Sequence, residues 1–164
     1  MAGPGGVLAV GTGAPDDRAP SHVWLARLDA AGEIAWEHTL GDDRASWRAR
    51  AATALADGFA VAGETATLDG VRAPHVWRLG PDGAVRWDHG YAGPDGGNGG
   101  NGGNAGEQVT GLAATGDGGL VVVGSIARGP GKTNVWVVRL DADGVVVWQR
   151  VFGRAAADAG SRPS

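Results

Sequence analysis

The nine-residue phrase LDAAGEIAW at 28–36 returns twice along the chain, as LGPDGAVRW at 79–87 and as LDADGVVVW at 140–148. Each copy ends in a Trp that stands four residues after a Gly. A short apolar phrase precedes each copy: GGVLAVG at 5–11, DGFAVAG at 57–63 and GGLVVVG at 118–124. The closing glycines of these apolar phrases are 52 and 61 residues apart. The chain is therefore an array of three units with a period of about 50 residues.

Repeats of this length that alternate short strands with turns form propeller-like or solenoid arrays, in which one unit cannot bury its apolar face alone. The 164 residues therefore divide into about three small units rather than one ordinary core. Most of the 31 glycines stand at turns between apolar runs, which favours an ordered chain over low complexity.

The formal net charge is −4, and acidic and basic residues are interspersed. Because lysines and arginines do not cluster, the sequence lacks the electrostatic signature of nucleic-acid or anionic-membrane binding. The chain has no cysteine, which excludes disulfides and thiolate metal sites. No stretch approaches the roughly 20 apolar residues of a membrane span, and MAGPGGVLAVG lacks the charged and apolar regions of a signal peptide. We therefore expect no nucleic-acid partner, no membrane span and no signal peptide in this chain.

Each unit is predicted to contain up to four short strands. The apolar phrase is bounded by glycines, as expected of a strand that is buried on both faces. A weaker strand precedes it at 47–55 and 108–115, and a strand with a Val-Trp pair follows it at 22–28, 75–79 and 134–140. A tight turn then leads to a fourth strand, which carries the Trp of the nine-residue phrase.

The Val-Trp strand alternates its side chains between two faces of the sheet. In the first unit one face carries Trp24, Ala26 and Leu28, and the other carries Val23, Leu25 and Arg27. The second copy is two residues shorter between its Trp and its Leu, and an even deletion keeps the alternation in phase. We therefore expect Trp77 to lie on the same face of its unit as Trp24 and Trp136.

The fourth strand follows turns whose glycines, Gly32, Gly83 and Gly144, suit positive φ. Three alternate positions of this strand are apolar in every copy, and we expect them to share one face: Ile34, Val85 and Val146; Trp36, Trp87 and Trp148; Leu40, Tyr91 and Phe152. A buried Trp contributes about 2–3 kcal/mol, so the three tryptophans are predicted to pack between neighbouring sheets. Trp47 has no counterpart in the other units, and the sequence assigns it no role.

The predicted units cover about 5–41, 45–93 and 107–153. Between the last two lies GPDGGNGGNGGNAG at 93–106, whose composition predicts a flexible insertion. Residues 154–164 are predicted to be a disordered tail. The first unit begins at its apolar strand, so the predicted count is eleven strands and the first unit lacks its first strand.

The succession of GGLVVVG and NVWVVRLDADGVVVWQRVFG resembles the bacterial propeller repeats that close on a Trp-Gln-Lys-Thr-Tyr-Gly phrase. The spacing of Leu28, Asp29, Gly32, Trp36 and Gly41 also resembles the tryptophan-docking motif of quinoprotein-like propellers, without the Thr before its Gly. The resemblance covers 5–153 and implies four-stranded antiparallel blades packed face to face about an axis. It also implies a cell-envelope or extracellular location. The predicted fold class is therefore all-β, a partial β-propeller of about three four-stranded antiparallel blades.

Histidines and turn aspartates are the candidate ligands for a metal. By the repeat, His22 and His75 match Asn134, whereas His38 and His89 match Arg150. Ligands must converge on one centre, but equivalent positions lie on different units. No calcium-loop spacing relates the acidic turn residues: Asp42, Asp43, Asp82, Asp117, Asp141 and Asp143. The GPGKT at 129–133 lacks the spacing of a phosphate loop and is predicted to be a hairpin tip. The sequence therefore predicts no catalytic residue, cofactor or metal.

Three matched units without recognisable chemistry predict a non-catalytic propeller-repeat scaffold or interaction module, part of a larger assembly. Its terminal units would expose apolar faces and strand edges, which favours self-association through open terminal blades or binding to a protein partner. Two alternatives stand beside this hypothesis. The chain is a truncated fragment of a secreted or surface propeller without independent function, or it is a metal- or quinone-binding propeller enzyme.

Overall fold

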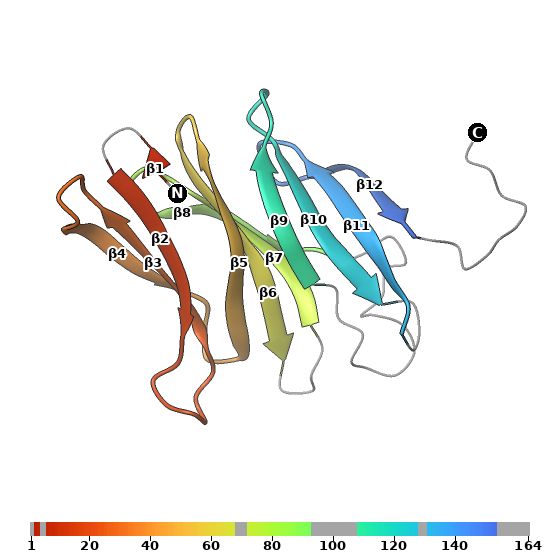
Figure 1. Ribbon diagram of the computed structural model, residues 1–164, viewed down its shortest axis with the longest axis horizontal. Coiled ribbons are helices and arrows are strands. Elements are labelled where there is room, and N and C mark those ends of the chain that lie inside the picture. The colour runs from red at the N-terminus through yellow and green to blue at the C-terminus, as the bar shows by residue number, and fades with distance from the viewer. Residues whose placement is uncertain (1, 4–5, 68–71, 93–107, 128–130, 154–164) are drawn as a thin grey trace, which may run out of the picture.

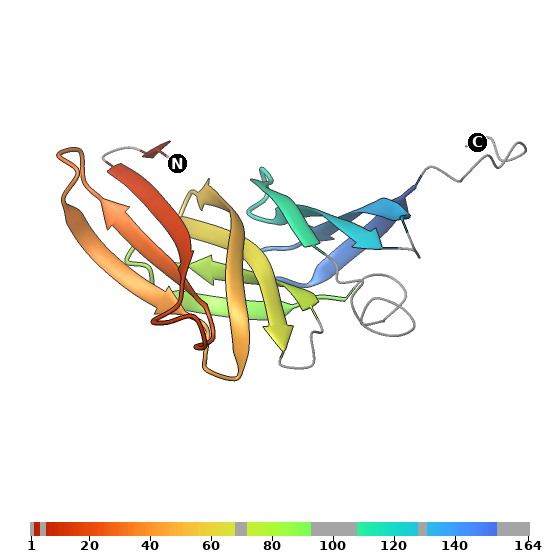
Figure 2. The ribbon, with the colours of Figure 1, turned by 60° about the horizontal axis from the view of Figure 1, so that its bottom comes forward.

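The computed structural model describes residues 2–3, 6–67, 72–92, 108–127 and 131–153. Within these ranges the chain is all β and forms three four-stranded antiparallel sheets. The sheets stand in a row in chain order, from the red first sheet to the blue third (Figure 1). Figure 2 shows the same row from a direction turned by 60°. The prediction of an all-β fold of antiparallel sheets is confirmed, whereas the arrangement about a propeller axis stays a prediction.

Every sheet is an up-and-down meander with its strands in sequence order. The first sheet contains β1 (Ala2–Gly3), β2 (Gly6–Gly13), β3 (His22–Leu28) and β4 (Ile34–Leu40). The second contains β5 (Ala45–Leu55), β6 (Gly58–Thr67), β7 (Arg72–Leu79) and β8 (Val85–Gly90). The third contains β9 (Gln108–Ala114), β10 (Leu120–Ala127), β11 (Thr133–Leu140) and β12 (Val146–Phe152). The predicted insertion at 93–106 and the predicted tail at 154–164 lie outside the described residues.

The prediction that the first unit lacks its first strand is wrong. β1 precedes β2 and pairs with it, Ala2 opposite Val7 and Gly3 opposite Gly6. It is much shorter than its counterparts, because β5 and β9 have 11 and 7 residues whereas β1 has 2. The sequence did not reveal this strand because Ala and Gly are weak β-formers and two residues show no alternation.

The apolar core is divided between two junctions, one between each pair of neighbouring sheets. The middle sheet contributes to both junctions, since Val61 of β6 packs with the first sheet and Ala62 packs with the third. Seven consecutive residues of β6, from Gly58 to Glu64, are buried. The prediction that the apolar strand is buried on both faces is therefore confirmed for the middle sheet.

The register of β7 corrects one predicted equivalence. In the outer sheets the glycine of the apolar strand lies opposite a Trp, Gly11 opposite Trp24 and Gly124 opposite Trp136. In the middle sheet Gly63 lies opposite His75, and Trp77 lies two residues further along. His75 therefore occupies the position of Trp24 and Trp136, not that of His22 and Asn134. The hairpin to the fourth strand sets the register, and the even shift leaves Trp77 on the predicted face.

His75 keeps the hydrogen bond of the tryptophans that it replaces. At this position a ring nitrogen contacts a polar side chain of the fourth strand in all three sheets: Trp24 Nε1 to Glu37 Oε2 at 3.2 Å, His75 Nε2 to Asp88 Oδ2 at 2.8 Å and Trp136 Nε1 to Gln149 Oε1 at 3.0 Å. Two indoles border the imidazole, with ring centroids 5.0 Å away for Trp47 and 4.6 Å away for Trp77. The middle sheet thus preserves the polar contact and adds an aromatic cluster.

Replacing His75 with Gln is expected to flatten the pH dependence of the free energy of unfolding. Burial lowers the pKa of His75 below its ordinary value of 6.5, and the hydrogen bond to Asp88 opposes this shift. The unfolded chain therefore takes up this proton at a higher pH than the folded chain does. The stability contributed by neutral His75 is present above about pH 6.5 and is lost as the pH falls below that value, until the folded pKa is reached.

Urea unfolding of the wild-type protein and of His75→Gln between about pH 7.5 and 5.5 measures this difference. The wild-type slope should exceed that of the variant by up to about 1.4 kcal/mol per pH unit. Parallel pH profiles for the two proteins would contradict the assignment.

Candidate functional site

A Trp of the fourth strand meets the hairpin turn of the next sheet at both junctions. Trp36 Nε1 donates a hydrogen bond to the carbonyl oxygen of Pro81 at 3.1 Å, and Trp87 Nε1 donates one to the carbonyl oxygen of Ala142 at 3.0 Å. Pro81 and Ala142 stand at the same position of the repeated turn. We call the Trp, the ring two residues after it and the turn that they meet the docking contact.

The turn of the docking contact requires a glycine for two reasons, its backbone conformation and the lack of space for a Cβ. Gly83 and Gly144 have φ values of 80° and 82°, which L side chains rarely adopt. A Cβ at Gly83 would also lie 2.4 Å from Cδ2 of His38, and one at Gly144 would lie 2.7 Å from Cδ2 of His89. Gly32, in the first sheet, has a φ of 84° but no atom within 4 Å of its would-be Cβ. Its turn therefore has the docking geometry without a docked ring.

The two fourth-strand histidines belong to the docking contact. His38 Nε2 lies 2.9 Å from the carbonyl oxygen of Asp82, in the same turn as Gly83. His89 stacks on Trp87 with ring centroids 5.1 Å apart and an interplanar angle of 17°. Among the described residues no group of three or more histidines and acids could hold a metal ion.

Tyr91 adds a buried hydrogen bond to the second docking contact. Its hydroxyl donates to the carbonyl oxygen of Gly144 at 2.6 Å. Burial raises the pKa of Tyr91, so the hydroxyl stays protonated and able to donate. In the first junction Leu40 holds the equivalent position and packs in the apolar cluster. The same repeat position is thus buried at both junctions, and in the second junction it also contributes the hydrogen bond from Tyr91.

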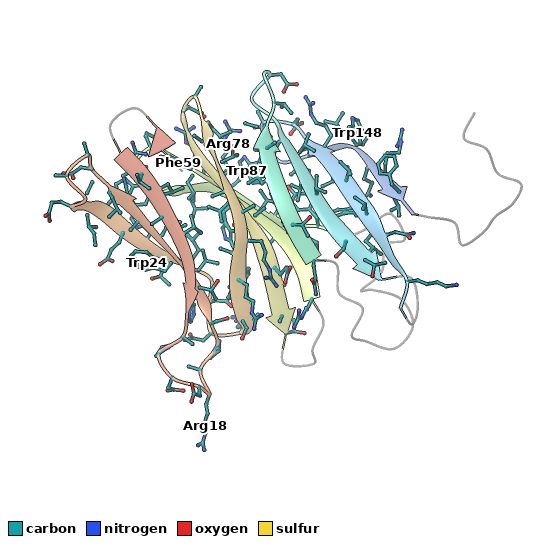
Figure 3. All side chains as sticks on the ribbon, in the orientation of Figure 1. Arg18, Trp24, Phe59, Arg78, Trp87 and Trp148 are labelled. Atoms are coloured by element: carbon teal, nitrogen blue, oxygen red, sulfur yellow. The ribbon has the colours of Figure 1, made fainter. Side chains whose placement is uncertain are left out.

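An Arg lies opposite the docking Trp in every sheet: Arg27 opposite Trp36, Arg78 opposite Trp87 and Arg139 opposite Trp148. The first two reach the next sheet. The Arg27 guanidinium lies 5.3 Å from the ring centroid of Phe59, and Arg78 Nη1 donates to the carbonyl oxygen of Gly118 at 2.7 Å. Figure 3 shows Phe59 between the first and second sheets, and Arg78 with Trp87 between the second and third.

Arg78 is also held by a carboxylate of its own sheet. Its Nη2 lies 2.9 Å from Oδ1 of Asp57, and Arg86 pairs with the other oxygen of that carboxylate. The hydrogen bonds from Arg78 and then Arg86 lower the pKa of Asp57 below its ordinary value. The buried guanidinium is therefore paired in its own sheet while it bonds to the next.

Repeat positions that are buried at the junctions are exposed at the two ends of the row. Phe152 is 58% exposed, whereas Leu40 and Tyr91, at the same position, are 6% and 9% exposed. Trp24 is 36% exposed, whereas Trp136 is fully buried. Trp148 is exposed as well, on the third sheet (Figure 3).

We therefore define two end faces. The tail face is the outward face of the third sheet and carries Val135, Arg139, Trp148, Arg150 and Phe152, which share one side of β11 and β12. The head face is the outward face of the first sheet and carries Val7, Trp24 and Glu37 together with the turn at 29–32. A hollow of about 300 Å³ lies beside Trp24 and is lined by Gly13, Ala14, Pro15, His22, Trp24 and Thr39.

One predicted apolar position is wrong. Ile34, Val85 and Val146 are exposed rather than packed with the tryptophans. The cause is a register shift at the start of every fourth strand, between Arg27 and Leu28 in the first sheet and at the matching residues of the others. The extra residue breaks the alternation that the prediction assumed.

Four of the six acidic turn residues accept hydrogen bonds from nearby backbone N–H groups: Asp42, Asp82, Asp117 and Asp141. Asp141 Oδ1 accepts hydrogen bonds from the backbone N–H groups of Asp143 and Val145, both at 2.9 Å. Asp42 and Asp82 accept comparable bonds from residues two further along. These contacts give the aspartates a role in shaping turns.

Trp47 is one of the junction residues that the repeat did not reveal. It is the third residue of β5 but bonds to segments that flank strands of the first sheet. Its N–H donates to the carbonyl oxygen of Ser21 at 2.8 Å, and its Nε1 donates to the carbonyl oxygen of Asp42 at 3.1 Å. A Cβ at Gly41 would lie 2.5 Å from the Trp47 ring. Trp47 therefore closes the first junction beside His75. The only sequence signal was an aromatic residue in an otherwise weak strand.

No protein-family model matches the chain, and no curated protein is significantly similar to it in sequence. In the part of the chain that the structure describes, no helix is long and apolar enough to cross a membrane. The resemblance to propeller repeats therefore stays a prediction that rests on the quoted motifs.

The three turn glycines offer a matched test of the docking contact. Replacing Gly32 with Ala should cost about 1–2 kcal/mol of stability, because only the left-handed backbone is strained. Replacing Gly83 or Gly144 with Ala should cost about 1–3 kcal/mol more, because the methyl group also displaces a docked ring. Urea unfolding at low protein concentration measures the three differences. Equal losses at all three glycines would show that ring docking contributes nothing.

Proposed function

We propose that this protein is a non-catalytic scaffold of stacked β-sheets whose head and tail faces bind polypeptide. One observation carries the proposal: the same repeat positions are buried wherever a sheet adjoins them and exposed at both ends of the row. Side chains of the kind that pack between sheets are thus exposed to solvent at each end of the row. We also propose that the row is a segment of a propeller. Contacts between neighbouring first strands, β5 with β9, and the directional docking contact support this arrangement.

The composition of the third sheet supports binding through the tail face. Val135, Trp148 and Phe152 of this face are 47%, 39% and 58% exposed. An apolar surplus gathered on a terminal sheet is typical of an interaction site.

We do not propose a metal- or quinone-dependent activity. Two of the four candidate histidines, His38 and His89, are engaged in the docking contacts. The buried Glu64 is likewise engaged, since it pairs with Arg50 at 3.2 Å and accepts the N–H of Val109 at 3.1 Å. These polar groups hold sheets together rather than converge on an open pocket.

Photo-crosslinking from single positions tests the proposed function. A benzophenone amino acid replaces Phe152 on the tail face or Trp24 on the head face, and the labelled protein is illuminated in an extract of the cells that produce it. We expect discrete protein adducts from both positions. Val85 is the matched control, because it is an exposed apolar residue of the middle sheet. Adduct patterns at Phe152 and Trp24 no different from that at Val85 would overturn the proposal.

A further inference from the structure

We propose that the occupant of both end faces is a second copy of this chain, bound head to tail, so that the tail face of each copy docks on the head face of the other. This inference rests on the proposed function and names the partner. The chain forms the required junction twice within itself, between its first and second sheets and between its second and third. The head and tail faces are the two unmatched halves of a further junction of the same kind.

The tail face carries the ring half of a docking contact. Trp148 stands at the position of Trp36 and Trp87, and the Arg150 guanidinium lies 6.0 Å from the centroid of its ring. Arg150 replaces the ring of His38 or His89, and a guanidinium can both stack on an indole and donate to a carbonyl. Both parts of the ring half are thus present, and no turn among the described residues receives them.

The head face carries the turn half. Gly32 has the left-handed backbone of the receiving glycines, and the space above it is open. By the register of the internal junctions, Trp148 Nε1 meets the carbonyl oxygen of Ala30, as Trp36 Nε1 meets that of Pro81. Arg150 meets the carbonyl oxygen of Ala31, the counterpart of Asp82.

The remaining surfaces of the two faces are complementary. Arg150 gives the tail face a basic group, since Arg139 on the same face already pairs with Asp117 of its own sheet. Glu37 gives the head face an acidic group. Opposite charges favour the head-to-tail pairing, and like charges oppose head-to-head and tail-to-tail pairing. The hollow beside Trp24 also provides room for an apolar side chain of the neighbour, in the place that Trp47 fills beside His75.

A head-to-tail junction is heterologous, so it forms either a closed ring or an open filament. The described residues of two copies supply six sheets, and closed propeller-like rings have about 4–8. Three copies would supply nine sheets and exceed that range. We therefore infer a closed dimer with two identical junctions.

Two variants on opposite faces test the inference. Gly32→Asn fills the receiving turn, and Asn tolerates positive φ, so the variant should keep its fold. Phe152→Asp places a charge on the tail face at an exposed position. The matched control is Val85→Asp, an exposed apolar position of the middle sheet. Circular dichroism and thermal melts of the variants at low concentration verify their folds.

Sedimentation equilibrium up to about 100 µM should show a dimer for the wild-type protein and for Val85→Asp. Each single variant damages both junctions of the dimer, so Gly32→Asn and Phe152→Asp should each weaken dimerisation by about 100-fold or more. An equimolar mixture of the two variants retains one intact junction. It should therefore form a heterodimer more tightly than either variant pairs with itself.

The outcomes separate this inference from the proposed function. A monomeric wild-type protein, an effect of only one of the two variants, or a mixture that pairs no better than its components would each overturn head-to-tail pairing. An average molar mass that rises beyond that of a dimer as the protein concentration increases would overturn the closed dimer. Crosslinks from Phe152 to a different protein would overturn the second copy as occupant while leaving the proposed function standing.

Discussion

The fold depends on the docking contact, in which the indole of one sheet packs on the glycine turn of the next sheet. The docking tryptophans Trp36 and Trp87 are half-buried, so each contributes less than the roughly 2–3 kcal/mol of a fully buried Trp, and its hydrogen bond contributes about 1 kcal/mol. Neither contribution is gained unless both sheets are in place. Gly83 and Gly144 make the docking contact possible, because a Cβ at either position would collide with a docked ring. No sheet can satisfy its own fourth strand, so stability belongs to pairs of neighbouring sheets.

The two junctions share the docking contact and differ at their other edge. The first is closed by Trp47, which packs on the ring of His75 and bonds to a segment that flanks the first sheet. The second is closed by the buried Glu64, which pairs with Arg50 and accepts the N–H of Val109 from β9. A paired buried carboxylate adds little net stability but penalises any arrangement that leaves it unpaired. We infer that the docking contact stabilises the packing of neighbouring sheets, whereas Trp47 and Glu64 determine which sheets become neighbours.

Much of this architecture could be predicted from the sequence, because the repeat states each position three times. Period-2 and period-50 patterns identify the strand that carries LAVG, AVAG or VVVG, the turn glycines and the Trp positions.

The pattern does not identify the register in which neighbouring strands pair. His75 looked equivalent to His22 because both precede Val-Trp, yet the hairpin places it opposite Gly63. Ile34 looked buried until the extra residue at the strand start turned it outward. Trp47 and Glu64 were not predicted because each acts at one junction only, and a repeat identifies only what recurs.

The docking contact also has a direction, and direction constrains how the array can be completed. Every sheet presents rings and an Arg on its following side and a glycine turn on its preceding side, so its two faces are never alike. A face of this kind cannot satisfy itself against a copy of the same face, since two ring sets would meet with no carbonyl to receive either N–H. Adding the acidic head and the basic tail makes like-to-like pairing unfavourable on electrostatic grounds as well. The same polarity that orders the sheets along the chain therefore determines which surface any neighbour must bring, whether that neighbour is another copy or a different polypeptide.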